Sequence, residues 1–226
     1  MISLKKITRR AAMFAGGLGI AALASSCGNG SVPLDPPSLA ARGLKAGEGY
    51  IVATFHSEVR PGDVPREKID ARSRLDIAGN GRQFSLTSAV NPAPSRSDRL
   101  GEILVIPATA GNYEITGWFM TGTGPASPIT VKNPGPIKVP FQVRPGEATY
   151  IGRYEAQAMV ARDFFSFPVF ADGILRATDR FTEDQMRIAD RYPSITRERI
   201  KRSDVPAVYQ AEMGRFREGR GFSGRF

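Results

Sequence analysis

The chain has 226 residues and a net charge of +9 at neutral pH, from 31 Lys and Arg against 22 Asp and Glu. It has one cysteine, Cys27, and one histidine, His56, which excludes an intramolecular disulfide and a metal site built from several histidines. Its length predicts one domain with tails.

Residues 1–26 have the layout of a secretory signal peptide. Four basic residues, at positions 5, 6, 9 and 10, precede an uncharged run over residues 11–24. That run is shorter than the roughly 20 apolar residues that a helix needs to span a bilayer. We therefore expect a processed segment, whose removal lowers the net charge from +9 to +5.

Residues 23–27, Leu-Ala-Ser-Ser-Cys, place small residues after an aliphatic one and before the lone cysteine. This stretch resembles the bacterial lipoprotein signal. The resemblance implies that the Cys27 thiol carries a diacylglyceryl group, that the chain is cut before Cys27, and that the new amino terminus is acylated, for instance with palmitate. Gly28, where the family's inner-membrane retention signal has Asp, favours the outer membrane, facing the periplasm.

The basic start leaves two export routes open. Thr8-Arg9-Arg10 resembles the start of a twin-arginine signal, although Ala12 stands where that motif favours Phe. The alternative is an ordinary basic region, and we favour this general secretory route.

Residues 27–48, rich in Gly and Pro, are predicted to be a lipidated tether. A β-domain is expected over residues 49–180. Asn80-Gly81 between strand-like segments predicts a hairpin, and Pro140 places the alternating segment over residues 137–143 at a sheet edge or bulge. The other segments predicted as strands are residues 50–56, 75–78, 83–90, 103–106, 112–119, 148–154 and 155–165.

Short strands separated by turns, without βα repeats, predict a mainly β fold, an antiparallel β-sandwich with short C-terminal helices. Residues 110–115 and 141–152 also resemble a pattern in uncharacterised bacterial lipoproteins. Those proteins carry a sandwich similar to transthyretin-like or carboxypeptidase-regulatory-like domains, so the resemblance implies a fold and no activity.

Residues 181–210 are predicted to form a short helical extension. Thr182-Glu183-Asp184-Gln185 has the form of a capping box, with Met186 and Ala189 on one helix face and Pro193 ending the helix. A second short helix is expected over residues 196–202. Residues 211–226, with Arg, Gly and Phe interleaved, are predicted to be a disordered basic tail suited to weak contact with a membrane surface.

The sequence offers little for catalysis. His56 lies in a predicted strand, and the chain has no nucleophile elbow, CxxC pair, P-loop or dinucleotide fingerprint. We therefore predict no catalytic residue, no metal site and no cofactor. Carboxylates could pair across a cleft, as in glycosidases, which leaves a carboxylate-dependent hydrolase of envelope polymers as the alternative. The carboxylates considered are Asp163, Asp172, Glu183 and Asp184.

Trp118 is the one candidate binding residue. Strict alternation from Tyr113 would place it on the wet face of its strand, where an indole could stack on a sugar ring. A bulge at Gly117 would instead return it to the core, and we favour the bulge.

These observations predict a non-enzymatic, lipid-anchored cell-envelope protein that binds or scaffolds. The expected partners are the membrane, through the N-terminal lipid, and a glycan or an envelope protein. No nucleic-acid partner is expected.

Overall fold

The structure, a computed structural model, describes residues 33–60, 71–90, 100–122, 129–133, 135–162 and 168–210. The signal segment, Cys27 and the tail over residues 211–226 lie outside the described residues. The elements, in chain order, are α1 (Pro36–Arg42), β1 (Glu48–Arg60), β2 (Ala71–Gly79), β3 (Arg82–Val90), β4 (Glu102–Thr109), β5 (Gly111–Gly122), β6 (Ile129–Lys132), β7 (Val139–Val143), β8 (Ala148–Arg162), β9 (Pro168–Thr178), α2 (Phe181–Arg191), η3 (Arg197–Arg199) and β10 (Ile200–Arg202).

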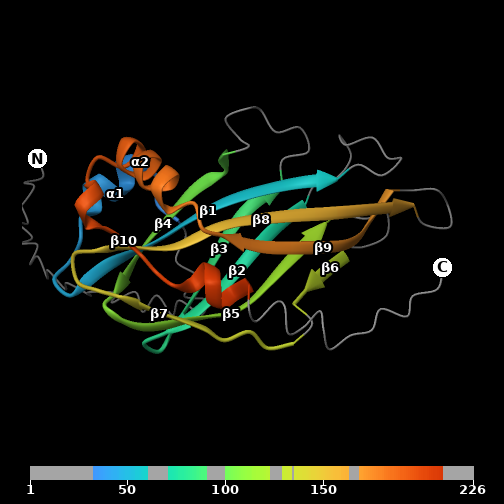
Figure 1. Cartoon of the computed structure of the whole chain (residues 1–226), viewed down its shortest axis with the longest axis horizontal. Helices are drawn as coiled ribbons and strands as arrows, with labels where there is room; N and C mark the ends of the chain where they lie inside the picture. The colour runs from blue at the N-terminus through green and yellow to red at the C-terminus, as the bar shows by residue number, and fades with distance from the viewer. Residues whose placement is uncertain are drawn as a thin grey trace, which may run out of the picture.

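The strands form two sheets that pack face to face as a sandwich (Figure 1). Sheet A runs β10-β8-β1-β4, with β9 pairing the later part of β8. Sheet B runs β3-β2-β5-β6, with β7 pairing the first part of β5. The predicted mainly β sandwich with short C-terminal helices is therefore confirmed.

Sheet A is mixed, whereas the prediction was purely antiparallel. β8 runs parallel to both β1 and β10, and the other pairs in this sheet are antiparallel. Parallel neighbours need a long crossover, and here the whole of sheet B lies between β1 and β8 in the chain.

Alternation along β1 explains why sheet A is buried on both faces. Ile51, Ala53 and Phe55 point into the core between the sheets, while Tyr50 and Val52 point into a second core under the helices. α1 and α2 cover this outer face and contribute Leu39, Ile188 and their neighbours (Figure 1). β4 follows the same rule, which is why its segment is apolar on both faces although β4 lies at the edge of the sheet order.

The predicted tether is shorter than expected, because α1 belongs to the fold. Asp35 caps this helix by accepting a hydrogen bond from the Ser38 N–H at 2.7 Å, and Leu39 is fully buried. The Leu34 N–H also donates to the Val105 carbonyl on the free edge of β4. Of the predicted tether, the described residues from Leu34 onward therefore belong to the folded domain.

The C-terminal part is also integral to the sandwich. Residues 205–210 are helical and bury Val205 and Tyr209 in the core between the sheets. The second predicted helix is instead the single turn η3 followed by β10, which pairs with β8 through backbone hydrogen bonds. The helical extension is thus not a separate unit.

Candidate functional site

The chain joins the domain where α1 meets the end of α2. The Tyr192 hydroxyl, just after α2, donates to the carbonyls of Leu34 and Ile103, both at 3.3 Å. Burial raises the pKa of Tyr192, so its phenol stays protonated as a donor. Leu34, near the start of the described residues, is therefore fixed to the domain by side-chain and backbone hydrogen bonds.

A buried ion network holds α2 on sheet A. Asp184, in the first turn of α2, is fully buried and accepts hydrogen bonds from the Tyr150 hydroxyl at 2.6 Å and from the Arg153 guanidinium. Arg187, one turn further along, donates to the same carboxylate at 3.0 Å. Two cations and a phenol therefore surround one carboxylate, which leaves it paired within the protein.

The pKa shifts of Tyr150 and Arg153 are those expected of a network that stabilises the fold. Burial, and then the hydrogen bond to Asp184, raise the pKa of Tyr150 far above its usual range. Burial alone would lower the pKa of Arg153, but the hydrogen bond and charge of Asp184 outweigh it and raise that pKa. Both donors therefore hold their protons at neutral pH.

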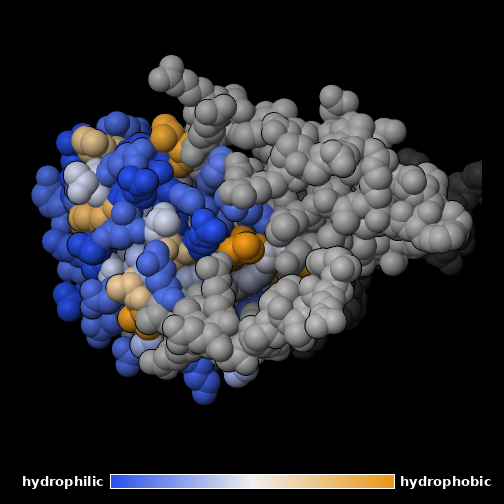
Figure 2. Space-filling model, turned by 45° about the vertical axis from the view of Figure 1, so that its right-hand side comes forward, coloured by the Kyte–Doolittle hydropathy of each residue, from blue (hydrophilic) through white to orange (hydrophobic). Residues whose placement is uncertain are grey.

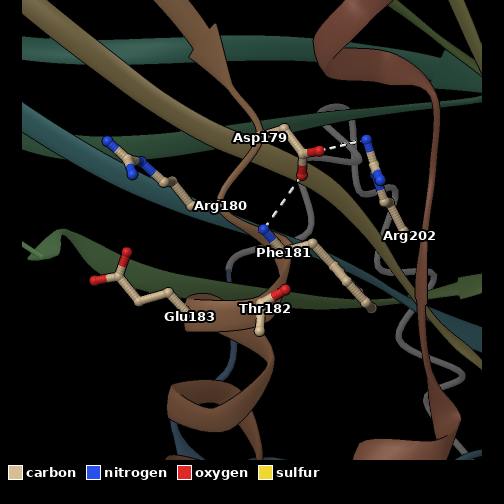
Figure 3. A pocket seen from close by; sticks show the side chains of 6 residues that line it. All are labelled: Asp179, Arg180, Phe181, Thr182, Glu183 and Arg202. Atoms are coloured by element: carbon tan, nitrogen blue, oxygen red, sulfur yellow. Dashed lines mark hydrogen bonds and ion pairs between the residues drawn. The ribbon is translucent and has the colours of Figure 1, made fainter.

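A shallow polar pocket of about 290 Å³ lies at the start of α2. The Asp179 carboxylate binds Arg202 and accepts the Phe181 N–H at 3.2 Å. Figure 3 shows this carboxylate between Arg202 and the helix start, with Arg180 and Glu183 pointing the other way. The lining residues are Asp179, Arg180, Phe181, Thr182, Glu183 and Arg202.

The predicted capping box is wrong. Arg180 is the N-cap, without a side-chain hydrogen bond, so Thr182 already lies inside the helix. Asp179 supplies the acceptor for the free N–H of Phe181 instead. The buried residues of α2 are Asp184 and Ile188. Met186 and Ala189, predicted on one helix face, differ in burial, since Met186 is 45% exposed and Ala189 packs against the second core.

Of the carboxylates considered for hydrolysis, the side chains of Glu183 and Asp184 are described, and only Glu183 lines this pocket. Glu183 and Asp184 both bind the Arg153 guanidinium, at 3.2 Å in the case of Glu183. Asp163 lies outside the described residues, and the side chain of Asp172 is not described either. His56 is half-buried on β1, in register with Glu155 of β8.

Trp118 lies in the core, 3% exposed, so it cannot serve as an exposed stacking platform. The reason is a bulge in β5: Asp76 pairs with Gly117 and Ile77 pairs with Ile115, which leaves Thr116 without a counterpart. The extra residue reverses the alternation after Ile115. The favoured prediction of a bulge is therefore the correct one.

Phe119, and not Trp118, lies on the outer face of sheet B. The Arg74 guanidinium lies 3.8 Å from the centre of its ring and is paired with Asp76 at 2.8 Å. Lys132 of β6 pairs with Phe119 on the other side, so an aromatic lies between two cations across three strands. Sequence alternation missed Phe119 because the bulge moves it from the inner to the outer face.

The described part of the chain contains no group of three or more His, Cys, Asp and Glu side chains placed to hold a metal ion. Among its helices, none is both long and apolar enough to span a bilayer. On the side of the molecule seen in Figure 2, hydrophobic residues of the described surface form small separate spots among hydrophilic ones. Comparison with models of known protein families and with curated protein sequences gives no match.

Proposed function

We propose that this chain is a lipid-anchored protein of the bacterial cell envelope, attached through Cys27, whose β-sandwich acts as a non-enzymatic binding or scaffolding module. The observation that carries the proposal is the sequence Leu-Ala-Ser-Ser-Cys over residues 23–27, which ends in the only cysteine. The outer membrane, facing the periplasm, is the proposed location.

The start of the folded domain supports this attachment. Leu34 follows Cys27 by seven positions, and its N–H and C=O are both hydrogen-bonded within the domain. An acylated Cys27 would therefore be followed, seven positions later, by a residue that is hydrogen-bonded to the folded domain. Several acyl chains, at about 0.8 kcal/mol for each buried methylene, anchor a protein stably where a single chain does not.

The outer face of sheet B supports a binding role. No described element packs over it, in contrast to the outer face of sheet A. Its central row presents Thr87, Arg74, Phe119 and Lys132 on four neighbouring strands. The cations and hydroxyl groups of this face can donate hydrogen bonds to sugar hydroxyls, and the Phe119 ring holds the Arg74 guanidinium in place among them. We propose a glycan or an envelope protein as the partner.

The anchor is tested by replacing Cys27 with Ser and by following the protein through membrane fractionation and labelling with an acyl-chain analogue. We expect loss of the label, with release of the protein from the membrane or accumulation of the unprocessed precursor. The matched control, Ser31→Ala, changes a residue after the cleavage site and should keep label and retention. A mature, labelled, membrane-bound Cys27→Ser protein would prove the attachment site wrong.

The binding face is tested separately with Phe119→Ala and Lys132→Ala against envelope polysaccharides. Binding to a polysaccharide by the parent, weakened in both variants, supports this face. The control is Arg176→Ala, an exposed cation on β9 in sheet A. Equal losses in control and test variants would contradict a site on sheet B.

A further inference from the structure

The lipid anchor and the folded domain are too close for the domain to stand away from a bilayer. Seven positions separate Cys27 from Leu34, and a fully extended chain of that length spans at most about 25 Å. The 15 residues of β8 alone make a strand of about 50 Å. The reach of the anchor is therefore about half the length of the longest strand.

The point of attachment lies on the side of sheet A that carries the helices. Leu34 directly precedes α1, and the carbonyl of Leu34 accepts the hydroxyl of Tyr192 after α2. Both helices cover the outer face of sheet A, opposite sheet B (Figure 1). A membrane within reach of Leu34 therefore meets the helices, or the end of the sandwich beside them, before it meets sheet B.

The same side carries both large hydrophobic residues that are exposed in the described part of the chain. Met186 of α2 is 45% exposed and Leu100 is 40% exposed. The two are linked through Arg187, which follows Met186 and donates to the Leu100 carbonyl at 2.6 Å and to the Gly101 carbonyl at 2.7 Å. Exposed apolar side chains on one side of a domain favour contact with an apolar or interfacial surface.

Exposed charged residues of both signs lie on α2 and next to both helices in the chain. Arg191 at the end of α2, Lys45 after α1 and Arg180 before α2 are exposed, and Asp190 is exposed beside them. Long basic side chains can reach lipid phosphates while their stems lie along apolar surface. This composition suits the headgroup region of a bilayer and does not suit insertion into hydrocarbon.

We propose that the surface formed by α1, α2 and Leu100 rests on the phospholipid headgroups, so that the outer face of sheet B points away from the membrane. The inference rests on the proposed attachment at Cys27. A short tether gives an effective concentration on the order of millimolar, so a contact too weak to recruit a free domain still orients a tethered one. The occupant of this surface is the bilayer that holds the anchor.

The test uses the mature lipidated protein in vesicles of phosphatidylcholine and phosphatidylglycerol. Because the thiol of Cys27 is consumed by lipid, a newly introduced cysteine is the only one that a thiol-reactive fluorophore labels. Met186→Cys and Leu100→Cys place the fluorophore on the helix side, and Thr87→Cys places it on the exposed outer face of sheet B. The measurement is quenching by lipids that carry a spin label near the headgroup.

We expect quenching several-fold stronger for fluorophores at positions 186 and 100 than for the one at position 87, together with a blue shift at the first two. Equally weak quenching at all three positions, in protein that floats with the vesicles, would overturn the contact and leave the anchor intact. Stronger quenching at position 87 would reverse the orientation and also overturn it. Protein that does not float with the vesicles would overturn the anchor, and this inference with it.

Discussion

The hydroxyl of Tyr150 donates a 2.6 Å hydrogen bond to the carboxylate of Asp184, which lies 34 residues further along the chain and is fully buried. This contact joins β8 to α2 beside the ion pair with Arg153. Replacing Asp184 with Asn would remove the buried counter-charge of the Arg153 guanidinium and leave it only the more exposed carboxylate of Glu183. We expect a loss of about 3–5 kcal/mol in the free energy of unfolding, measured by urea denaturation.

The matched control for this loss is Asp190→Asn in the same helix. The Asp190 side chain is 76% exposed and lies 3.9 Å from Arg197, so its replacement should change the stability by less than about 0.5 kcal/mol. Similar effects of the two substitutions would show that the network does not hold α2 in place.

The pair formed by Arg42 and Glu48 predicts a dependence of stability on pH. Hydrogen bonds from Arg42, at 2.9 and 3.0 Å, are the main cause that holds the pKa of Glu48 below its ordinary value of 4.5. A carboxyl whose pKa is lower in the folded than in the unfolded protein stabilises the fold fully when the pH is above its unfolded-state pKa. This stabilisation is lost as the pH falls through its folded-state pKa. Glu48→Gln should therefore destabilise the protein at neutral pH and differ less from the parent below pH 4.5. The measurement is urea denaturation of the parent and of Glu48→Gln between pH 7 and pH 4. A difference in their free energies of unfolding that stays constant over this range would contradict the pairing.

Asn80 stabilises its turn in two ways, through its backbone conformation and through its side-chain hydrogen bonds. Its φ of 50° is left-handed, and its Nδ2 donates to the Ala110 carbonyl at 3.1 Å and to the Tyr113 hydroxyl at 3.2 Å. Asn80→Gly keeps the turn and loses these bonds, for an expected cost of about 1–2 kcal/mol. Asn80→Ala adds the strain of a left-handed alanine, about 1 kcal/mol more. Equal free energies of unfolding of the two variants in urea would show that the left-handed backbone at position 80 costs alanine nothing, contrary to this prediction.

The environment of Trp118 can be read directly, because it is the only tryptophan. Its side chain is 3% exposed, so we expect blue-shifted fluorescence that acrylamide quenches poorly in the native protein and strongly in urea. Red-shifted, easily quenched emission in the native state would contradict the bulge in β5 and restore an exposed indole.

Features set by neighbouring residues could be predicted from the sequence. Asn80 and Gly81, both with positive φ, form the predicted turn between β2 and β3. Pro140 lies on β7, which pairs with β5 and with no other described strand. This edge position is the one that the missing N–H of proline predicts. The bulge that returns Trp118 to the core was also the favoured alternative.

Features set by distant residues could not. Thr182 fits the pattern of an N-cap, yet the N-cap is Arg180, two residues earlier, and Asp179, which is held by Arg202, accepts the hydrogen bond of the Phe181 N–H. The stretch before β1 is poor in apolar residues, yet a single buried side chain, Leu39, fixes it on sheet A. Its neighbours in the sequence do not predict the burial of Asp184, because its partner Arg153 lies on strand β8, 31 residues earlier.

The parallel pairing of β1 with β8 also sets the order in which the chain can fold. Tyr50 is in register with Ala148, and Ala148 is in register with Ile200, so sheet A needs three segments that are far apart in the sequence. Folds dominated by such distant pairings form in milliseconds to seconds, more slowly than those with local contacts. β1 can therefore complete its pairing in sheet A only once β8 is available, and β8 in turn completes its own pairing with β10 near the end of the described residues.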